Sequence, residues 1–128
     1  MIDSRSSWCI SRQRYWGVPI PAFHHFANHD DVILDSKVID SIAEIVRKQG
    51  TDCWWQLDVN QLLQSPNVDR SKYRKGGDTM DVWFDSGTAW TQSSQGQANL
   101  AIEGSDQFRG WFQSSLITSI ACQNKPAY

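Results

Sequence analysis

The sequence predicts an α/β fold, and three features of the chain support this prediction. Val38, Ile42 and Val46 recur with the spacing of one helix face, which predicts an amphipathic helix. Short apolar, partly β-branched segments elsewhere are typical of strands. Near the end of the chain, the apolar residues 100–102 precede a glycine-bearing turn and a second helical pattern. Ligands of open α/β sheets bind beyond the carboxyl ends of strands, so we expect a binding site at this turn.

The first elements predicted are short strands joined by irregular backbone. Residues 8–11 suit a strand, whereas Gly17, Pro19 and Pro21 forbid a regular helix in the segment that follows. Residues 23–34 predict a strand pair or a loop, with residues 32–34 as the second strand.

A longer helix is predicted next, with Ser36 as its N-cap and Gly50 as its stop. Arg47 and Lys48 fall in its last turn, where cations oppose the negative end of the helix dipole. Residues 58–64 predict a short helix, and the polar residues 65–77 predict an exposed, flexible loop.

The last third of the chain is predicted to alternate strands and connections before a final helix. Residues 80–84 predict a strand, residues 91–97 a connection and residues 100–102 a short buried strand. The final helix is expected to run to about Cys122. Its predicted apolar face consists of Phe112, Leu116 and Ile120.

Composition limits the classes of protein that fit. A length of 128 residues with 40% apolar content suits one domain or part of one, and a net charge of −2 argues against a wholly basic nucleic-acid-binding surface. No apolar run approaches the roughly 20 residues of a membrane span. The three cysteines are far apart and odd in number, so we expect reduced thiols.

Two acidic segments are candidate binding sites. The turn at residues 103–107 places Glu103, Asp106 and Gln107 around Gly104, where carboxylates could hold a substrate ammonium or ribose hydroxyls. The alternative is that Ser105 or Asp106 only caps a helix. Residues 81–87 end in an acid, a hydroxyl and a glycine, and Trp83 there could wall an apolar pocket or belong to a core strand.

Other clusters of polar and aromatic residues are more ambiguous. Residues 12–16 combine Arg12 and Arg14 with two aromatic rings, which suits phosphate and base contacts or internal ion pairs. The histidines at positions 24, 25 and 29 are more typical of a solvated turn than of a metal site. No pattern of a catalytic nucleophile or of a phosphate-binding glycine loop is present, so we assign no catalytic residue and no metal ligand.

Three separated segments together resemble signatures of the isoleucyl-tRNA synthetases, which are class I aminoacyl-tRNA synthetases. They are Trp8-Cys-Ile-Ser-Arg-Gln-Arg-Tyr-Trp-Gly-Val-Pro-Ile-Pro21, Asp81-Val-Trp-Phe-Asp-Ser-Gly87 and Glu103-Gly-Ser-Asp-Gln-Phe-Arg-Gly-Trp-Phe112. Their order also matches, and the pair Trp54-Trp55 followed by Asp58 is a further likeness. The resemblance covers nearly the whole chain from Trp8 onward.

The resemblance implies that the chain is part of a Rossmann-type catalytic domain, as the half that resumes after a large editing insertion. It implies a connective insertion at residues 22–78, with a small α+β structure from about residue 24, and Rossmann elements at residues 79–128. It also implies adenylate contacts and two tryptophans that wall the isoleucine side chain. The adenylate contacts would be Glu103, Gly104, Asp106 and Gln107, and the wall Trp83 and Trp111.

The implied partners are L-isoleucine, ATP as a substrate with Mg²⁺ held by other parts of the domain, and tRNA(Ile). A monomeric full-length enzyme without membrane contact is expected. The family's two ATP signatures, His-Ile-Gly-His and Lys-Met-Ser-Lys-Ser, are absent, so we expect a piece of a longer protein that is inactive alone. His24-His25 and residues 111–116 resemble the mitochondrial branch, which favours the mitochondrial matrix over the cytoplasm.

Two alternatives to an isoleucine enzyme remain open at this point. One is a class I synthetase that is specific for valine or leucine. The other is a non-catalytic RNA- or protein-binding remnant of the fold.

Overall fold

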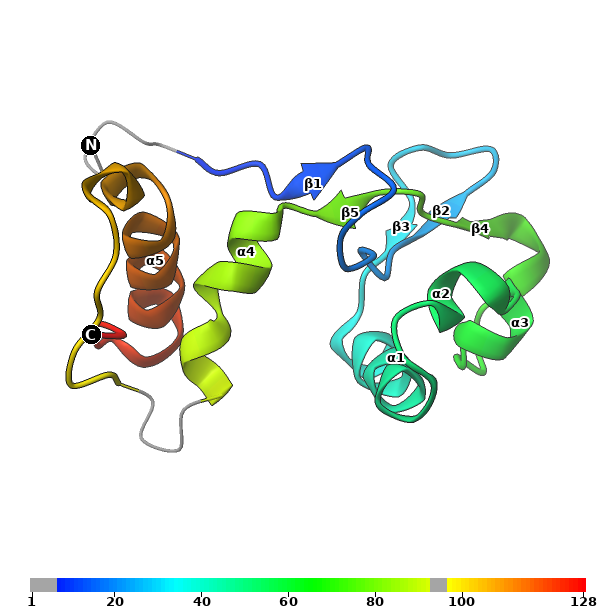
Figure 1. Cartoon of the computed structure of the whole chain (residues 1–128). Coiled ribbons are helices and arrows are strands. Elements are labelled where there is room, and N and C mark those ends of the chain that lie inside the picture. Colours follow the sequence, from blue (N-terminus) through cyan, green and yellow to red (C-terminus); the bar gives the residue numbers. More distant parts are fainter. Residues whose placement is uncertain (1–6, 93–96) are drawn as a thin grey trace. The chain divides into compact units, whose positions relative to one another are not determined.

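The computed structural model describes residues 7–92 and 97–128, and the chain divides into two compact units (Figure 1). The central unit comprises residues 13–79, and the terminal unit comprises residues 1–12 and 80–128. Each unit combines helices with short strands. Positions 93–96 of the predicted connection at residues 91–97 lie outside the described residues.

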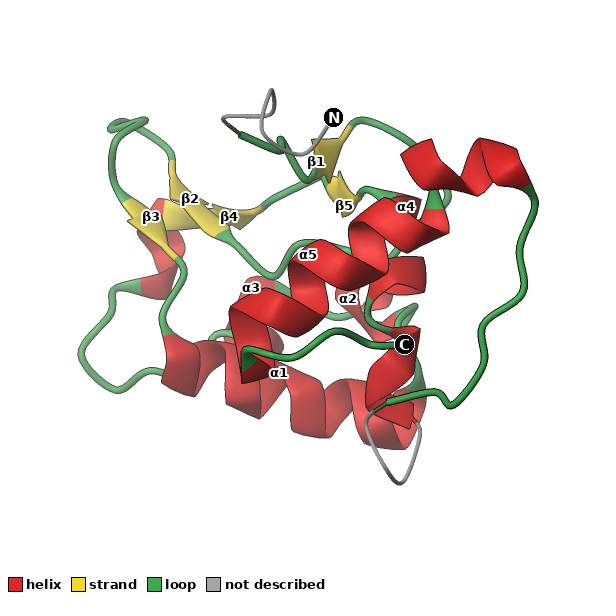
Figure 2. Ribbon diagram, turned by 90° about the vertical axis from the view of Figure 1, so that its left-hand side faces the viewer, coloured by secondary structure: helices red, strands yellow, loops and turns green. Residues whose placement is uncertain are grey.

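The central unit contains a three-stranded antiparallel sheet in the order β3-β2-β4 (Figure 2). The strands are β2 (Phe23–His25), β3 (Val32–Ile33) and β4 (Tyr73–Lys75). The predicted strand pair at residues 23–34 is therefore confirmed.

The predicted flexible loop at residues 65–77 is wrong, because it contains the 3₁₀ helix η1 (Arg70–Lys72) and β4. Polar β4 residues gain their order by pairing with β2, a partner far away in the sequence. The Tyr73 hydroxyl also donates to an Asp31 carboxylate oxygen at 2.9 Å, and this bond is the main cause that raises the pKa of Tyr73.

The predicted long helix is confirmed as α1 (Ser36–Gln49), with a cap one residue earlier than expected. The Asp35 carboxylate, not Ser36, accepts the Lys37 N–H, and Gly50 ends the helix with a φ of 81°. One face of α1 packs into the core of the unit. The buried residues of this core are Phe23, Val38, Ile42, Trp54, Leu62 and Leu63.

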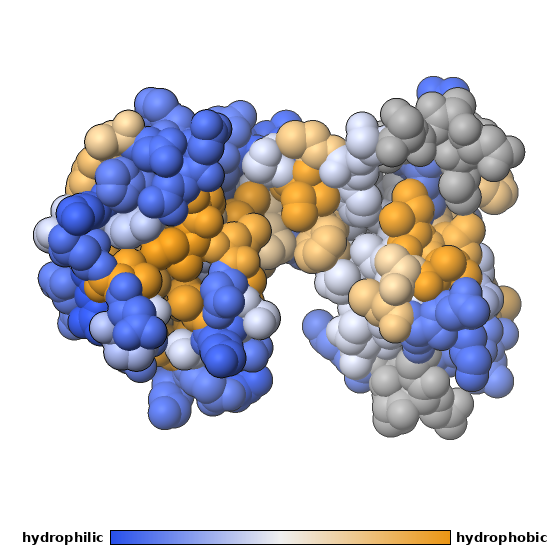
Figure 3. All heavy atoms as spheres, turned by 180° about the vertical axis from the view of Figure 1, so that it is seen from behind, coloured by the Kyte–Doolittle hydropathy of each residue, from blue (hydrophilic) through white to orange (hydrophobic). Residues whose placement is uncertain are grey.

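Two short helices complete the central unit. These are α2 (Cys53–Gln56) and α3 (Val59–Leu62), and α3 confirms the helix predicted within residues 58–64. Asp58 and Gln61 form a reciprocal capping box at the start of α3. On the face in Figure 3, apolar side chains of this unit reach the surface between hydrophilic ones.

The terminal unit is built mainly from α4 (Val82–Gly87) and α5 (Trp111–Gln123), which pack against each other (Figure 1). The 3₁₀ helices η2 (Ala89–Gln92) and η3 (Ser105–Arg109) also contact α5. β1 (Ser11–Arg12) pairs with β5 (Thr79–Met80). The strand predicted at residues 8–11 therefore begins only at Ser11.

Two predicted strands of the terminal unit are wrong. Residues 82–84 are helical, because the Asp81 carboxylate accepts the Trp83 N–H at 3.1 Å and starts α4. Residues 100–102 have no regular structure, and Leu100 and Ile102 are 75% and 82% exposed. A strand needs hydrogen-bonded neighbours, and this segment pairs with no other strand within the described residues.

The final helix is confirmed, but the prediction of its buried face is wrong. Its buried residues are the small or polar ones, and Ile120 of the predicted apolar face is 43% exposed. Gly87 of α4 explains the difference, because a Cβ added there would lie 2.9 Å from the Ser114 Cβ. The close approach of the two helices selects small side chains over large apolar ones.

Among the helices of residues 7–92 and 97–128, none is both long enough and apolar enough to cross a bilayer.

Candidate functional site

The bend at residues 103–107 is open to solvent. Glu103, Gly104 and Asp106 are exposed, and Gly104 precedes η3. No side chain caps η3, so the alternative role of Ser105 or Asp106 as a helix cap is not what the structure has. A Cβ at Gly104 would lie 2.5 Å from Asp106 Oδ1, so glycine lets this carboxylate fold back over the bend.

Gln107 connects the bend to the start of α5. Its amide nitrogen donates to Asp106 Oδ2 at 3.1 Å, and its amide oxygen accepts the Trp111 N–H at 3.0 Å. These two bonds fix the orientation of the Gln107 amide. The Asp106 carboxylate is thereby tied to the first turn of a long helix.

Gly110 is the point where the bend meets α4. A Cβ added there would lie 2.5 Å from Gln107 Oε1 and 2.9 Å from Trp83 Cη2. The Gln107 amide and the Trp83 indole therefore both pack on the bare backbone of Gly110, which is itself buried. Any larger residue would displace one of them.

Trp83 lies on α4 and is 40% exposed. It contributes to a cavity of about 180 Å³ within the terminal unit. The cavity is lined by Trp8, Arg12, Asp81, Trp83, Arg109, Gly110, Gln113, Ser114 and Ile117. Its wall thus combines an indole face with charged and polar groups.

Asp81 binds two other residues that line this cavity. Asp81 is 6% exposed, and its carboxylate accepts from Trp8 Nε1 at 3.0 Å and from the Arg12 guanidinium at 2.5 Å. Arg12 therefore forms an internal ion pair, one of the two roles expected for it from the sequence. The pair is only partly buried, because the side chain of Arg12 is 33% exposed and that of Asp81 is 9% exposed.

Trp111 is the first residue of α5. Its Nε1 donates to the Ser86 carbonyl at 3.0 Å, and its ring packs near Phe112 and Tyr128, with centroids 5.7 and 5.9 Å away. Trp111 does not line the cavity at Trp83. The structure therefore bonds Gln107 to the Trp111 backbone and packs both Gln107 and Trp83 on Gly110, but of the two tryptophans only Trp83 lines this cavity.

The family model of the class I tRNA synthetases for isoleucine, leucine, methionine and valine matches residues 1–128. The chain belongs to the class I tRNA synthetases. Among its relatives are isoleucine–tRNA ligases from a Synechococcus species (50% identical), from Arabidopsis thaliana, as the chloroplastic/mitochondrial form (47%), and from mouse mitochondria (45%).

These alignments cover all of this synthetase chain, but it spans only 14%, 12% and 13%, respectively, of the length of these relatives. The bacterial and organellar relatives have similar identities. The chain is therefore similar to isoleucine–tRNA ligases of both the bacterial and the organellar kind, and the identities do not distinguish the two.

Gly110 and Asp81 were not singled out as site residues by the sequence analysis of this synthetase. The signal for Gly110 was available, because a lone glycine separates two helical segments next to the predicted pocket residue Trp111. The pairing of Asp81 with Trp8 and Arg12 had no local signal. It joins residues 73 and 69 positions apart in the sequence.

His24 and His25 belong to the strand β2, and only His29 lies in the turn that follows it. His25 Nδ1 accepts the backbone N–H groups of Ala27 and Asn28, both at 3.1 Å. Within residues 7–92 and 97–128, no group of three or more His, Cys, Asp or Glu side chains is arranged to hold a metal ion.

Proposed function

We propose that this chain is part of the catalytic domain of an isoleucine–tRNA ligase, which activates L-isoleucine with ATP and transfers it to tRNA(Ile). The observation that carries this proposal is the match of the entire chain to isoleucine–tRNA ligases at 45–50% identity, including all three signature segments. In this proposal residues 79–128 supply the second half of a Rossmann-type domain, and residues 22–78 are a connective insertion.

The bend at residues 103–107 would contact the aminoacyl-adenylate. The exposed carboxylates of Glu103 and Asp106 suit a substrate ammonium and ribose hydroxyls, since both ligands present hydrogen-bond donors. Gly104 leaves room for the Asp106 carboxylate next to the backbone, which presents that carboxylate at the bend. The Gln107 amide, which forms two hydrogen bonds, holds the Asp106 carboxylate in one orientation before the ligand binds. This lowers the entropic cost of binding.

Trp83 and Trp111 would wall the isoleucine side chain. An indole face is large, rigid and apolar, and it can accept a branched aliphatic group. A slot of this kind separates isoleucine from valine by only about 1–3 kcal/mol, because the two differ by one methylene. Trp83, but not Trp111, lines the cavity of about 180 Å³, which supports the role of Trp83 more directly than that of Trp111.

The reaction needs no covalent nucleophile from the protein. The amino-acid carboxylate attacks the α-phosphate of ATP, pyrophosphate leaves, and the ribose hydroxyl of the tRNA end then displaces AMP. This chain's residues would orient the amino acid and the ribose for the in-line attack. The described residues offer no cluster that fits Mg²⁺, so we assign that ion to other parts of the ligase.

The proposal is tested with a chimeric ligase. Residues 1–128 replace the corresponding segment of the Synechococcus enzyme, and a control carries that enzyme's own segment with identical junctions. We expect isoleucine-dependent exchange of pyrophosphate into ATP, and charging of tRNA, in both proteins. No exchange in the chimera alongside full activity in the control would contradict the proposal. Preferential activation of valine or leucine would show that the chain comes from a ligase specific for that amino acid.

Three further expectations accompany this proposal: inactivity of the isolated chain, a mitochondrial location and a monomeric state. The 128 residues alone are expected to give no exchange above background. We propose a mitochondrial location on the likeness of His24-His25 and residues 111–116 to that branch, and we propose a monomeric ligase. Imaging of the tagged full-length protein in its own cells tests the first, and its mass in solution tests the second.

A further inference from the structure

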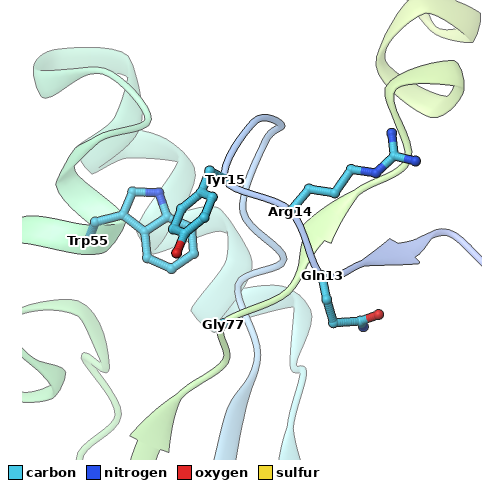
Figure 4. Close-up of a pocket in the computed structure, with 5 residues that line it drawn as sticks. All are labelled: Gln13, Arg14, Tyr15, Trp55 and Gly77. Atoms are coloured by element: carbon cyan, nitrogen blue, oxygen red, sulfur yellow. The ribbon is translucent and has the colours of Figure 1, made fainter.

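A second cavity lies in the central unit, whereas the residues proposed to hold the adenylate belong to the terminal unit. It measures about 480 Å³ and is lined by Gln13, Arg14, Tyr15, Trp55 and Gly77 (Figure 4). Its walls are predominantly two aromatic rings and one cationic residue. None of the residues that line this cavity takes part in the activation of the amino acid as proposed above.

Both rings of this cavity are exposed. Tyr15 is fully exposed and Trp55 is 46% exposed, although the neighbouring Trp54 is completely buried. Among the described residues, neither ring packs against another aromatic ring. Two uncovered aromatic rings on one cavity are a ready surface for a flat partner.

The backbone beneath Trp55 is held firmly. Trp54 Nε1 donates to the Gly76 carbonyl at 3.1 Å, and Lys75 Nζ donates to the carbonyls of Trp54 and Trp55 at 2.6 and 3.4 Å. Burial lowers the pKa of this lysine. Trp55 is thus presented from an anchored turn, and its indole loses little further freedom when it binds a partner.

The opposite wall is fixed by a different set of contacts. Gln13 Nε2 donates to Asp78 Oδ1 at 3.2 Å, and the Ile20 N–H donates to the Asp78 carbonyl at 3.0 Å. Between them, Gly17 has a φ of 140°, which a residue with a side chain rarely adopts. The bend at Gly17 keeps the segment with Tyr15 beside the cavity.

Arg14 complements the rings without covering them. In Figure 4 its side chain extends away from Tyr15 and Trp55, so the guanidinium does not occupy the space next to the rings. It forms no ion pair within the described part of the chain. A cation at that position suits the phosphate next to a stacked base.

We propose that this cavity binds an unpaired base of single-stranded RNA, stacked on Trp55 and Tyr15, with Arg14 on an adjacent phosphate. This inference rests on the proposed function, which supplies tRNA and its single-stranded end as the RNA. Stacking tolerates any base, because every base offers a π face. A protein segment is disfavoured, since the lining offers few aliphatic side chains to receive one.

Gly77 gives a way to close the cavity without disturbing the fold. A Cβ added there meets no heavy atom within 4 Å. Gly77→Leu therefore places a side chain in open space beside the rings. It should compete with the base while leaving the core intact.

The test measures tRNA charging and pyrophosphate exchange in the chimeric ligase. Trp55→Ala, Tyr15→Ala and Gly77→Leu are expected to raise the KM for tRNA about tenfold, in line with the loss of a stacked base. Isoleucine-dependent exchange, which needs no tRNA, stays unchanged. Trp55→Phe keeps a ring and retains most of the affinity.

Trp16→Ala is the matched control, because Trp16 is an equally conspicuous ring, 83% exposed, that does not line the cavity. It should change the KM for tRNA by less than about twofold. An unchanged KM in Trp55→Ala and Gly77→Leu overturns the proposal, and so does an equal effect of Trp16→Ala.

Failure of the proposed function would be recognised separately, as absence of exchange in the unsubstituted chimera. Binding of labelled tRNA to the same variants then decides the inference by itself. Weaker binding in the three cavity variants supports it, and equal binding overturns it.

Discussion

Asp106 has a role that the sequence left open between ligand binding and helix capping. The structure removes the second role, because η3 begins without a side-chain cap. The Asp106 carboxylate is exposed, and within residues 7–92 and 97–128 it accepts a side-chain hydrogen bond from the amide of its neighbour Gln107 alone, at 3.1 Å. A side chain with so few contacts contributes little to folding, so an effect of its removal should appear mainly in ligand binding.

Asp106→Ala in the chimeric ligase is therefore expected to weaken binding of a non-hydrolysable isoleucyl-adenylate analogue about tenfold, the order of one charge-assisted hydrogen bond. The melting temperature should move by less than about 2 °C, as for other exposed substitutions. Calorimetric titration and thermal unfolding measure the two effects. Asp106→Asn keeps one acceptor for Gln107 and should lose affinity without altering the fold. Equal affinities in all three proteins would contradict a role of Asp106 in the ligand site.

Among the elements, local patterns predicted helices better than strands. The 3.6-residue period of α1 and the Asp58 and Gln61 capping box of α3 depend on neighbours in the sequence, and both helices form where expected. β4 and the start of α4 depend on contacts that the apolar pattern of the segment does not reveal. β4 needs β2 as its partner, and residues 82–84 are helical through the Asp81 cap although their apolar run also suits a strand.

The candidate site shows the same limit. The residues of the bend could be named from their chemistry, whereas the packing of Trp83 and Gln107 on Gly110 could not. Likewise, the apolar spacing in α5 pointed to the wrong buried face, because the determining neighbour is Gly87 on another helix. Patterns within one element cannot specify which face another element will approach.

The contact between α4 and α5 leads to a prediction for Gly87. Gly87→Ala places a Cβ 2.9 Å from the Ser114 Cβ, so the helices must separate, at a cost of about 1–3 kcal/mol in the free energy of unfolding. Urea unfolding of the 128-residue chain measures this. Gly77→Ala is the matched control, because its new Cβ meets nothing within 4 Å and should be neutral or slightly stabilising. Equal stability of the two variants would rule out a tight helix contact.

For the molecule as a whole, the segment at residues 100–102 links sequence, structure and proposed function. Its apolar, partly β-branched residues are suited to a buried strand, yet Leu100 and Ile102 are exposed and unpaired with any strand within the described residues. An exposed apolar strand lacks the burial that normally offsets the entropy of ordering it. In the proposed ligase, the rest of the catalytic domain would supply the missing neighbours.

Hydrogen exchange measured by mass spectrometry should reveal this difference. Amides at residues 100–102 are expected to exchange rapidly in the 128-residue chain, because their N–H groups face water. In the chimeric ligase the same peptide should become protected by at least about tenfold, since pairing with a neighbouring strand removes those N–H groups from solvent. A peptide from α1 is the internal reference, since its helical hydrogen bonds are complete within the chain and its protection should be similar in both proteins. Rapid exchange of residues 100–102 in both proteins would mean that the segment is no strand of the ligase, and the acidic bend that follows it would lose its expected place at the end of a sheet.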